Sequence, residues 1–81
     1  DRPSTRQDLA VMLWRYAGSP EPRKNEVDFC DAGKVSGYAW KAICWANENG
    51  IVNGKGNGIL DPQGRATRAE TAQMLMNYLK K

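Results

Sequence analysis

The chain lacks histidine altogether and has only two cysteines and one phenylalanine among its 81 residues. Zinc centres and nucleophilic active sites depend on histidine, or on cysteine or serine beside a base. Neither arrangement occurs here, and the acidic residues form no convergent pair, so we expect no enzyme, no metal and no cofactor. The apolar runs are a few residues long, which predicts no membrane insertion.

The charge is mild, with a net value of +3 from 12 basic and 9 acidic residues. The basic residues are scattered rather than gathered into a stripe, which argues against nucleic-acid binding and favours a weak preference for acidic partners. The apolar content of 41% is sufficient for one small packed domain. A disulfide between Cys30 and Cys44 and two free thiols both remain open, and free thiols are favoured.

One segment of the sequence occurs twice. Residues 5–16 (TRQDLAVMLWRY) recur as residues 67–78 (TRAETAQMLMNY), at an offset of 62 residues. Threonine, arginine, alanine, methionine, leucine and tyrosine stay in register, and an acid holds the same place in both copies. A repeat at such a period predicts a modular array.

Apolar spacing predicts three helices, over residues 5–17, 37–49 and 67–79, with Ser36 as the N-cap of the second. Residues 27–29 are expected to be extended, and the glycine-rich segment 53–58 to form a tight turn. The fold class is therefore all-α, a small three-helix bundle. The tryptophans of the second helix are expected to cover its edges. The expected inner faces are Leu9, Met12, Leu13 and Tyr16; Ala39, Ala42, Ile43 and Ala46; and Thr71, Met74, Leu75 and Tyr78.

Both copies of the repeated segment begin with a capping signal. Thr67 and Glu70 have the spacing of a capping box, in which each side chain binds the other residue's backbone N–H. Thr5 and Asp8 form a shorter version of the same arrangement. Capping accounts for these four residues almost completely.

Arg6 and Arg68 are harder to explain, because each occupies the first helical position, where the helix dipole disfavours a cation. A guanidinium beside free backbone N–H groups is a suitable anion site. The alternative is that Arg68 binds an internal acid such as Asp31 or Asp61. The sequence leaves both interpretations open.

Aromatic side chains gather near the expected start of the second helix. Tyr38 and Trp40 could stack on the face of a sugar, although packing within the core or between repeats is favoured. The glycine-rich segment 53–58 lacks the ligands of an EF-hand and the Gly-Lys-Ser/Thr of a P-loop. Turn formation is its favoured role.

Five short motifs stand in the order of an S-layer homology (SLH) repeat, and the chain resembles that family over residues 27–79, with the last helix of a preceding repeat before it. The resemblance implies three domain segments: 1–17 as that preceding helix, 18–26 as a connector, and 27–81 as a complete repeat. The motifs are Phe29-Cys30-Asp31, Tyr38-Ala39-Trp40-Lys41-Ala42-Ile43, Gly50-Ile51-Val52-Asn53-Gly54, Asn57-Gly58-Ile59-Leu60-Asp61-Pro62 and Ala66-Thr67-Arg68-Ala69-Glu70.

The resemblance implies an extracellular module that attaches surface proteins to the bacterial envelope by binding acidic, often pyruvylated, secondary cell-wall polysaccharides. It also implies packing against other SLH repeats of the same chain, or self-association of the fragment. The alternative is a protein–protein interaction or spacer module that binds no glycan. The implied ligand-binding residues are Arg68 and Arg6 for charge, Thr67 and Thr5 for the helix starts, and Tyr38 and Gly54 for the groove.

Overall fold

The computed structural model describes residues 5–24, 26–27, 29–52 and 60–80, and its regular elements are all helical. Three α-helices, α1 (Arg6–Tyr16), α2 (Trp40–Glu48) and α3 (Arg68–Lys80), are accompanied by two 3₁₀ helices, η1 (Ala32–Lys34) and η2 (Gly37–Ala39), which precede α2. The predicted all-α bundle of three helices is confirmed. The glycine-rich turn predicted at 53–58 lies outside the described residues.

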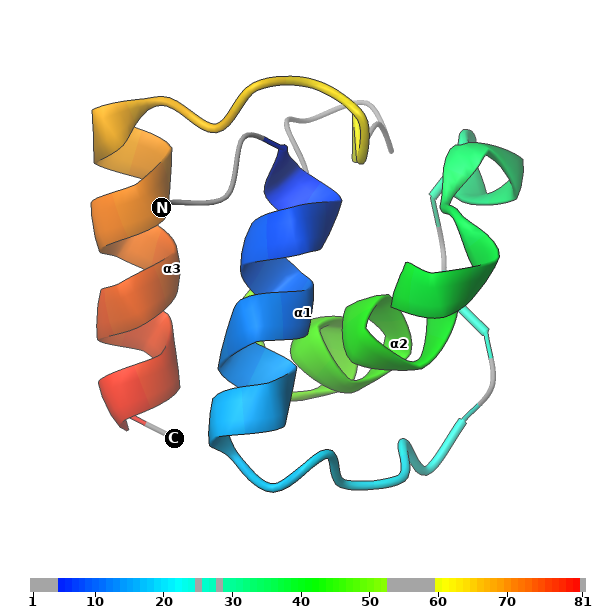
Figure 1. The fold of residues 1–81 in the computed structure, drawn as a ribbon, viewed down its shortest axis with the longest axis horizontal. Coiled ribbons are helices and arrows are strands. Elements are labelled where there is room, and N and C mark those ends of the chain that lie inside the picture. The colour runs from blue at the N-terminus through cyan, green and yellow to red at the C-terminus, as the bar shows by residue number, and fades with distance from the viewer. Residues whose placement is uncertain (1–4, 25, 28, 53–59, 81) are drawn as a thin grey trace.

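α1 is the central helix, and it contacts α2, η2 and α3 (Figure 1). The two copies of the repeated segment, α1 and α3, run in the same direction and begin at the same end of the molecule (Figure 1). η2 lies on the other side of α1 from α3 (Figure 1). The first turn of α1 is therefore flanked by η2 and by the start of α3.

The core lies mainly between α1 and α2, where small side chains on α2 let the two helices approach closely. Trp45, which was expected to cover an edge of the inner face of α2, is only 4% exposed and belongs to the core. Met12 and Tyr16 are 43% and 83% exposed, so two of the four residues expected on the inner face of α1 face outward. The buried apolar residues include Leu9, Ala10, Leu13, Ala39, Ala42, Ile43, Ala46, Ile51, Leu60 and Met74.

The ends of the helices follow local chain chemistry. Gly18 and Gly50, which follow α1 and α2, have φ values of +96° and +72°, a conformation that glycine adopts without strain. Ser36 does not cap α2 as predicted, because η2 intervenes and α2 begins at Trp40. The Ser36 hydroxyl instead accepts a hydrogen bond from Nε2 of Gln7 at 2.9 Å. Within the described part of the chain, no helix combines the length and apolarity needed to cross a membrane.

Candidate ligand-binding surface

Arg6, the first residue of α1, has its guanidinium bound by two carboxylates of the chain itself. Nη2 donates to both carboxylate oxygens of Glu70 at 2.6 Å, and Nη1 donates to Oδ2 of Asp61 at 3.2 Å. The Arg6 side chain is only 10% exposed. This differs from the open anion site expected at Arg6, because internal acids already balance its charge.

A tight turn places Asp61 beside Arg6. Asp61 has a φ of +55°, and the carboxylate of Asp31 holds the turn by accepting the backbone N–H groups of Leu60 at 3.0 Å and Asp61 at 2.8 Å. The bond from Leu60 is the main reason that the pKa of Asp31 is lowered. A Cβ at Gly64 would overlap both the Asp61 carboxylate and the Arg6 guanidinium. Any larger residue at position 64 would therefore force the ends of these two side chains to shift.

Glu70 serves two purposes at the start of α3. It accepts the backbone N–H of Thr67 at 2.9 Å, while the Thr67 hydroxyl accepts the N–H of Glu70 at 3.1 Å, so the predicted capping box is confirmed. The hydrogen bond from Arg6, followed by that from Thr67, lowers the pKa of Glu70. At α1 the Thr5 hydroxyl accepts the N–H of Asp8 at 3.1 Å, which is one half of the same motif.

Arg68 has a different environment from Arg6, its counterpart in the repeat. It is the first residue of α3 and is exposed. Neither of the acids that the sequence suggested for it, Asp31 and Asp61, pairs with it; Asp61 pairs with Arg6. Among the residues that the structure describes, the Arg68 guanidinium has no ion pair or side-chain hydrogen bond. Its charge remains open to a ligand.

Tyr38 lies beside the first turn of α1, on the side opposite α3. Its hydroxyl donates to Oδ1 of Asp8 at 2.5 Å and accepts from Nε2 of Gln7 at 3.3 Å. The bond to Asp8 raises the pKa of Tyr38. The residue is nevertheless 60% exposed. Its hydroxyl is thus fixed by α1 while much of the side chain faces outward.

A groove of about 340 Å³ lies next to Tyr38 along α1. Asp8 and Arg15 line it with opposite charges, and they are two helical turns, about 10 Å of helix rise, apart. Val11 and Met12 line it between them. The groove therefore combines an aromatic side chain, an apolar floor, a hydrogen-bond acceptor and a guanidinium.

Four of these groove residues, Asp8, Val11, Met12 and Arg15, were not predicted as site residues. Met12 was assigned to the core and Asp8 only to a cap. Residues three and four apart share one face of a helix, so the spacing of 8, 12 and 15 is a signal that could have grouped them. The sequence alone does not show which face a partner helix covers.

The predicted site residues do not form one cluster. Thr5, Arg6 and Thr67 lie at the junction of α1 and α3, whereas Tyr38 is on η2. The starts of α3 and η2 are nevertheless at the same end of the molecule (Figure 1). Gly54 lies outside the described residues. In the part of the chain that the structure describes, no group of acids or cysteines is arranged to hold a metal, and no disulfide joins Cys30 and Cys44.

Comparison with known proteins places the sequence in a family. The sequence model of the S-layer homology domain matches residues 28–72. The amylopullulanase of Thermoanaerobacterium thermosulfurigenes is 40% identical over 81 residues, which are 95% of this chain and 4% of that protein. The exoglucanase XynX of Acetivibrio thermocellus is 30% identical over 95% of this chain and 8% of its own length. No solved structure matches significantly.

The chain belongs to the S-layer homology domain family. Such domains are generally non-catalytic modules that anchor surface proteins to the cell wall, and they occur in cell-surface and S-layer-associated proteins. The expected family, fold class and location are confirmed. The chain spans less than a tenth of the length of these two relatives.

Proposed function

We propose that this module anchors its protein by binding an acidic secondary cell-wall polysaccharide, with pyruvate ketals as a source of the acidic groups. The observation that carries the proposal is the open groove along α1, where the exposed Tyr38 and the exposed Arg15 are brought together. This arrangement matches the mixed character of an acidic sugar, which has apolar C–H faces, hydroxyl groups and a carboxylate.

Each part of the groove has a role in this proposal. The Tyr38 ring and Met12, which is 43% exposed, offer apolar surface to the C–H face of a sugar ring. The Asp8 carboxylate can accept a sugar hydroxyl beside the Tyr38 hydroxyl that it already binds. Arg15 can hold a carboxylate through two parallel N–H···O bonds, which are stronger than bonds between neutral groups.

Arg68 provides a second cationic contact, at the start of α3, on the other side of α1 from Tyr38 in η2 (Figure 1). Its guanidinium is open, and it stands at the N-terminus of a 13-residue helix, where a ligand carboxylate is favoured by the helix dipole. Thr67 fixes that helix start through its cap, and Thr5 does the same for α1. In this scheme Arg6 holds α1 against α3, and the part of Gly54 in shaping the groove stays a prediction.

The outer face of α3 supports a further partner, another SLH repeat or a second copy of this chain. Leu13 on α1 is 3% exposed, whereas its repeat counterpart Leu75 on α3 is 38% exposed. Met76 and Leu79 on the same helix are 51% and 77% exposed. The same face favours the second candidate function, a protein–protein interaction or spacer module that binds no glycan.

Co-sedimentation with cell-wall sacculi that carry their polymer tests the groove. Losing a hydrogen bond to a charged group costs about 1.5–3 kcal/mol, so Arg15→Ala should weaken binding about tenfold or more. Tyr38→Ala should also weaken it. Tyr16→Ala, which removes an exposed tyrosine outside the groove, is the matched control and should bind as the unchanged protein does. Equal sedimentation of all four proteins would contradict the role of the groove.

A further inference from the structure

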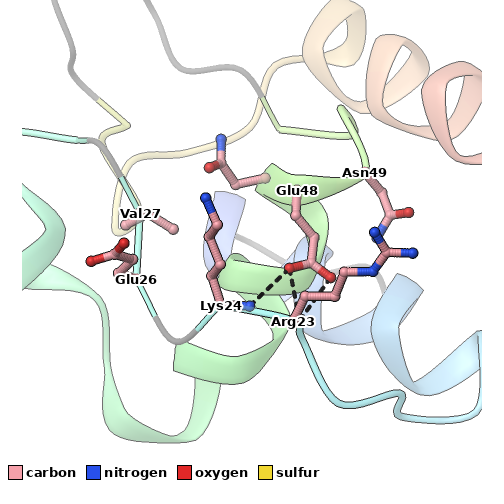
Figure 2. Close-up of a pocket in the computed structure, with 7 residues that line it drawn as sticks. Arg23, Lys24, Glu26, Val27, Glu48 and Asn49 are labelled. Carbon is pink, nitrogen blue, oxygen red and sulfur yellow. Dashed lines mark hydrogen bonds between the residues drawn. The ribbon is translucent and has the colours of Figure 1, made fainter.

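A cavity of about 480 Å³ lies away from Tyr38, between the connector after α1 and the end of α2 (Figure 2). Its lining is almost entirely polar, with Val27 as the one apolar side chain. Sites for apolar ligands are lined mainly by hydrophobic groups. A polar cavity of this size suits a hydroxyl-rich ligand, a class to which saccharides belong.

Glu48 fixes one wall of this cavity. Its carboxylate accepts the backbone N–H of Arg23 at 2.9 and 3.0 Å and that of Lys24 at 3.3 Å (Figure 2). A carboxylate held by consecutive N–H groups clamps the connector to the last turn of α2. The two residues that carry cationic side chains are therefore held by their backbones at defined positions.

The side chains of Arg23 and Lys24 remain open. Both residues are exposed, and neither side chain has an ion pair or hydrogen bond with another described residue. They extend to opposite sides of the Glu48 carboxylate, and Glu26 lies beyond Lys24 with its carboxylate pointing away (Figure 2). The Glu48 carboxylate is bound by backbone N–H groups and not by these two side chains, so both cations can bind an added anion.

Two amide side chains supply fixed acceptors beside the cations. Nδ2 of Asn49 donates to the backbone oxygen of Trp45 at 2.8 Å, and Nδ2 of Asn47 donates to that of Val52 at 3.2 Å. These bonds orient both amides and leave their oxygen atoms to accept hydrogen bonds from a ligand. Sugar hydroxyl groups are donors of the required kind.

We infer that this cavity is a second binding site for a carboxylate-bearing saccharide, with Arg23 and Lys24 supplying cationic contacts on either side of Glu48 and with Asn47 and Asn49 accepting sugar hydroxyls. The inference rests on the proposed function, because the ligand is the same acidic polymer. Two contacts on one molecule raise the apparent affinity for a polymer beyond that of either contact alone, provided that one chain of the polymer reaches both.

Titration of the full chain with a uronic-acid trisaccharide, followed by amide NMR shifts, tests the site directly. Shifts should appear at residues 23, 24, 47 and 49, and they should be much smaller with the neutral trisaccharide of the same linkage. No shifts there, or equal shifts with both trisaccharides, would overturn the inference. This readout does not depend on whether the groove binds the cell wall.

Sedimentation with polymer-bearing sacculi provides the second test. Replacing both Arg23 and Lys24 with alanine should weaken binding about tenfold, whereas the charge-matched replacement of Lys34 and Lys80, exposed lysines outside the cavity, should weaken it less than twofold. Equal losses in the two double variants would reject the cavity as a site. If the cavity is not a binding site but the proposed function holds, Tyr38→Ala still weakens binding to the sacculi. If the proposed function is wrong, the unchanged protein binds equally to sacculi with and without the polymer.

Discussion

Arg6 and Glu70 occupy the second and fourth positions of two copies of the same four-residue motif, and they bind each other across the two copies. The distances from Nη2 to both carboxylate oxygens are 2.6 Å. The same Glu70 carboxylate caps α3 through the N–H of Thr67. The Glu70 side chain thus fixes both the start of α3 and its position against α1, which makes this pair the joint between the two copies of the repeated segment.

Glu70→Gln should destabilise the fold by about 1–3 kcal/mol, because it leaves the mostly buried Arg6 cation with one acid fewer. Urea unfolding measures the change. Glu21→Gln is the control, since it removes an exposed pair with Lys41, and such pairs contribute little. Equal effects of the two substitutions would show that the Arg6–Glu70 pair contributes no more than a surface contact.

The stability of the chain should fall in acid, and Glu70 should account for part of the fall. Arg6 lowers the pKa of Glu70 in the folded chain below the usual value of 4.5. Glu70 in the unfolded chain therefore binds a proton more readily than Glu70 in the folded chain. The stabilisation that the Arg6–Glu70 pair gives is complete at pH values above the unfolded pKa, and it is lost as the pH falls through the lowered pKa of the folded chain. Unfolding midpoints of Glu70→Gln should decline less than those of the unchanged protein on acidification. An identical decline would contradict this coupling.

Gly64→Ala should destabilise the fold by about 1–3 kcal/mol, a typical cost of overpacking. The added Cβ would meet the Asp61 carboxylate and the Arg6 guanidinium, so the ion pair must move. Gly33→Ala is the matched control, because nothing lies within 4 Å of a Cβ there. Thermal unfolding compares them, and a Gly64→Ala protein as stable as the Gly33→Ala protein would refute the close approach.

The two copies of the repeated helix should tolerate the same substitution differently. Leu13→Ala should lower the free energy of unfolding by about 2–5 kcal/mol, because the Leu13 side chain of α1 is buried in the core. Leu75→Ala, at the equivalent position of α3, should cost about 1 kcal/mol or less, since Leu75 is 38% exposed. Comparable losses of stability would mean that α3 is covered in solution, as self-association would cause.

Local chemistry made the helices predictable. The capping box of Thr67 and Glu70 depends on residues three apart, and Gly18 and Gly50 end helices through their own backbone freedom. The pairing of Arg6 was not predictable, because its partners Asp61 and Glu70 are 55 and 64 residues away. Only the packed fold shows which of two equivalent arginines is neutralised.

The sequence also did not predict correctly which side chains of α1 are buried. Helical spacing placed Met12 and Tyr16 on the same face as Leu9 and Leu13, yet the first two face outward. Spacing gives the period of a helix, but the edge of its buried face depends on where neighbouring helices cross it. Met12 is also one of the residues that line the groove beside Tyr38.

The most direct test of the anchoring claim is the binding of the unchanged protein to native sacculi and to sacculi stripped of their secondary polymer. We expect sedimentation with the native wall, a loss of most of it after stripping, and a reduced amount for Arg68→Ala, whose fold should be unaffected because Arg68 is exposed. Equal sedimentation with both wall preparations would contradict recognition of the polysaccharide and would favour a module that contacts protein.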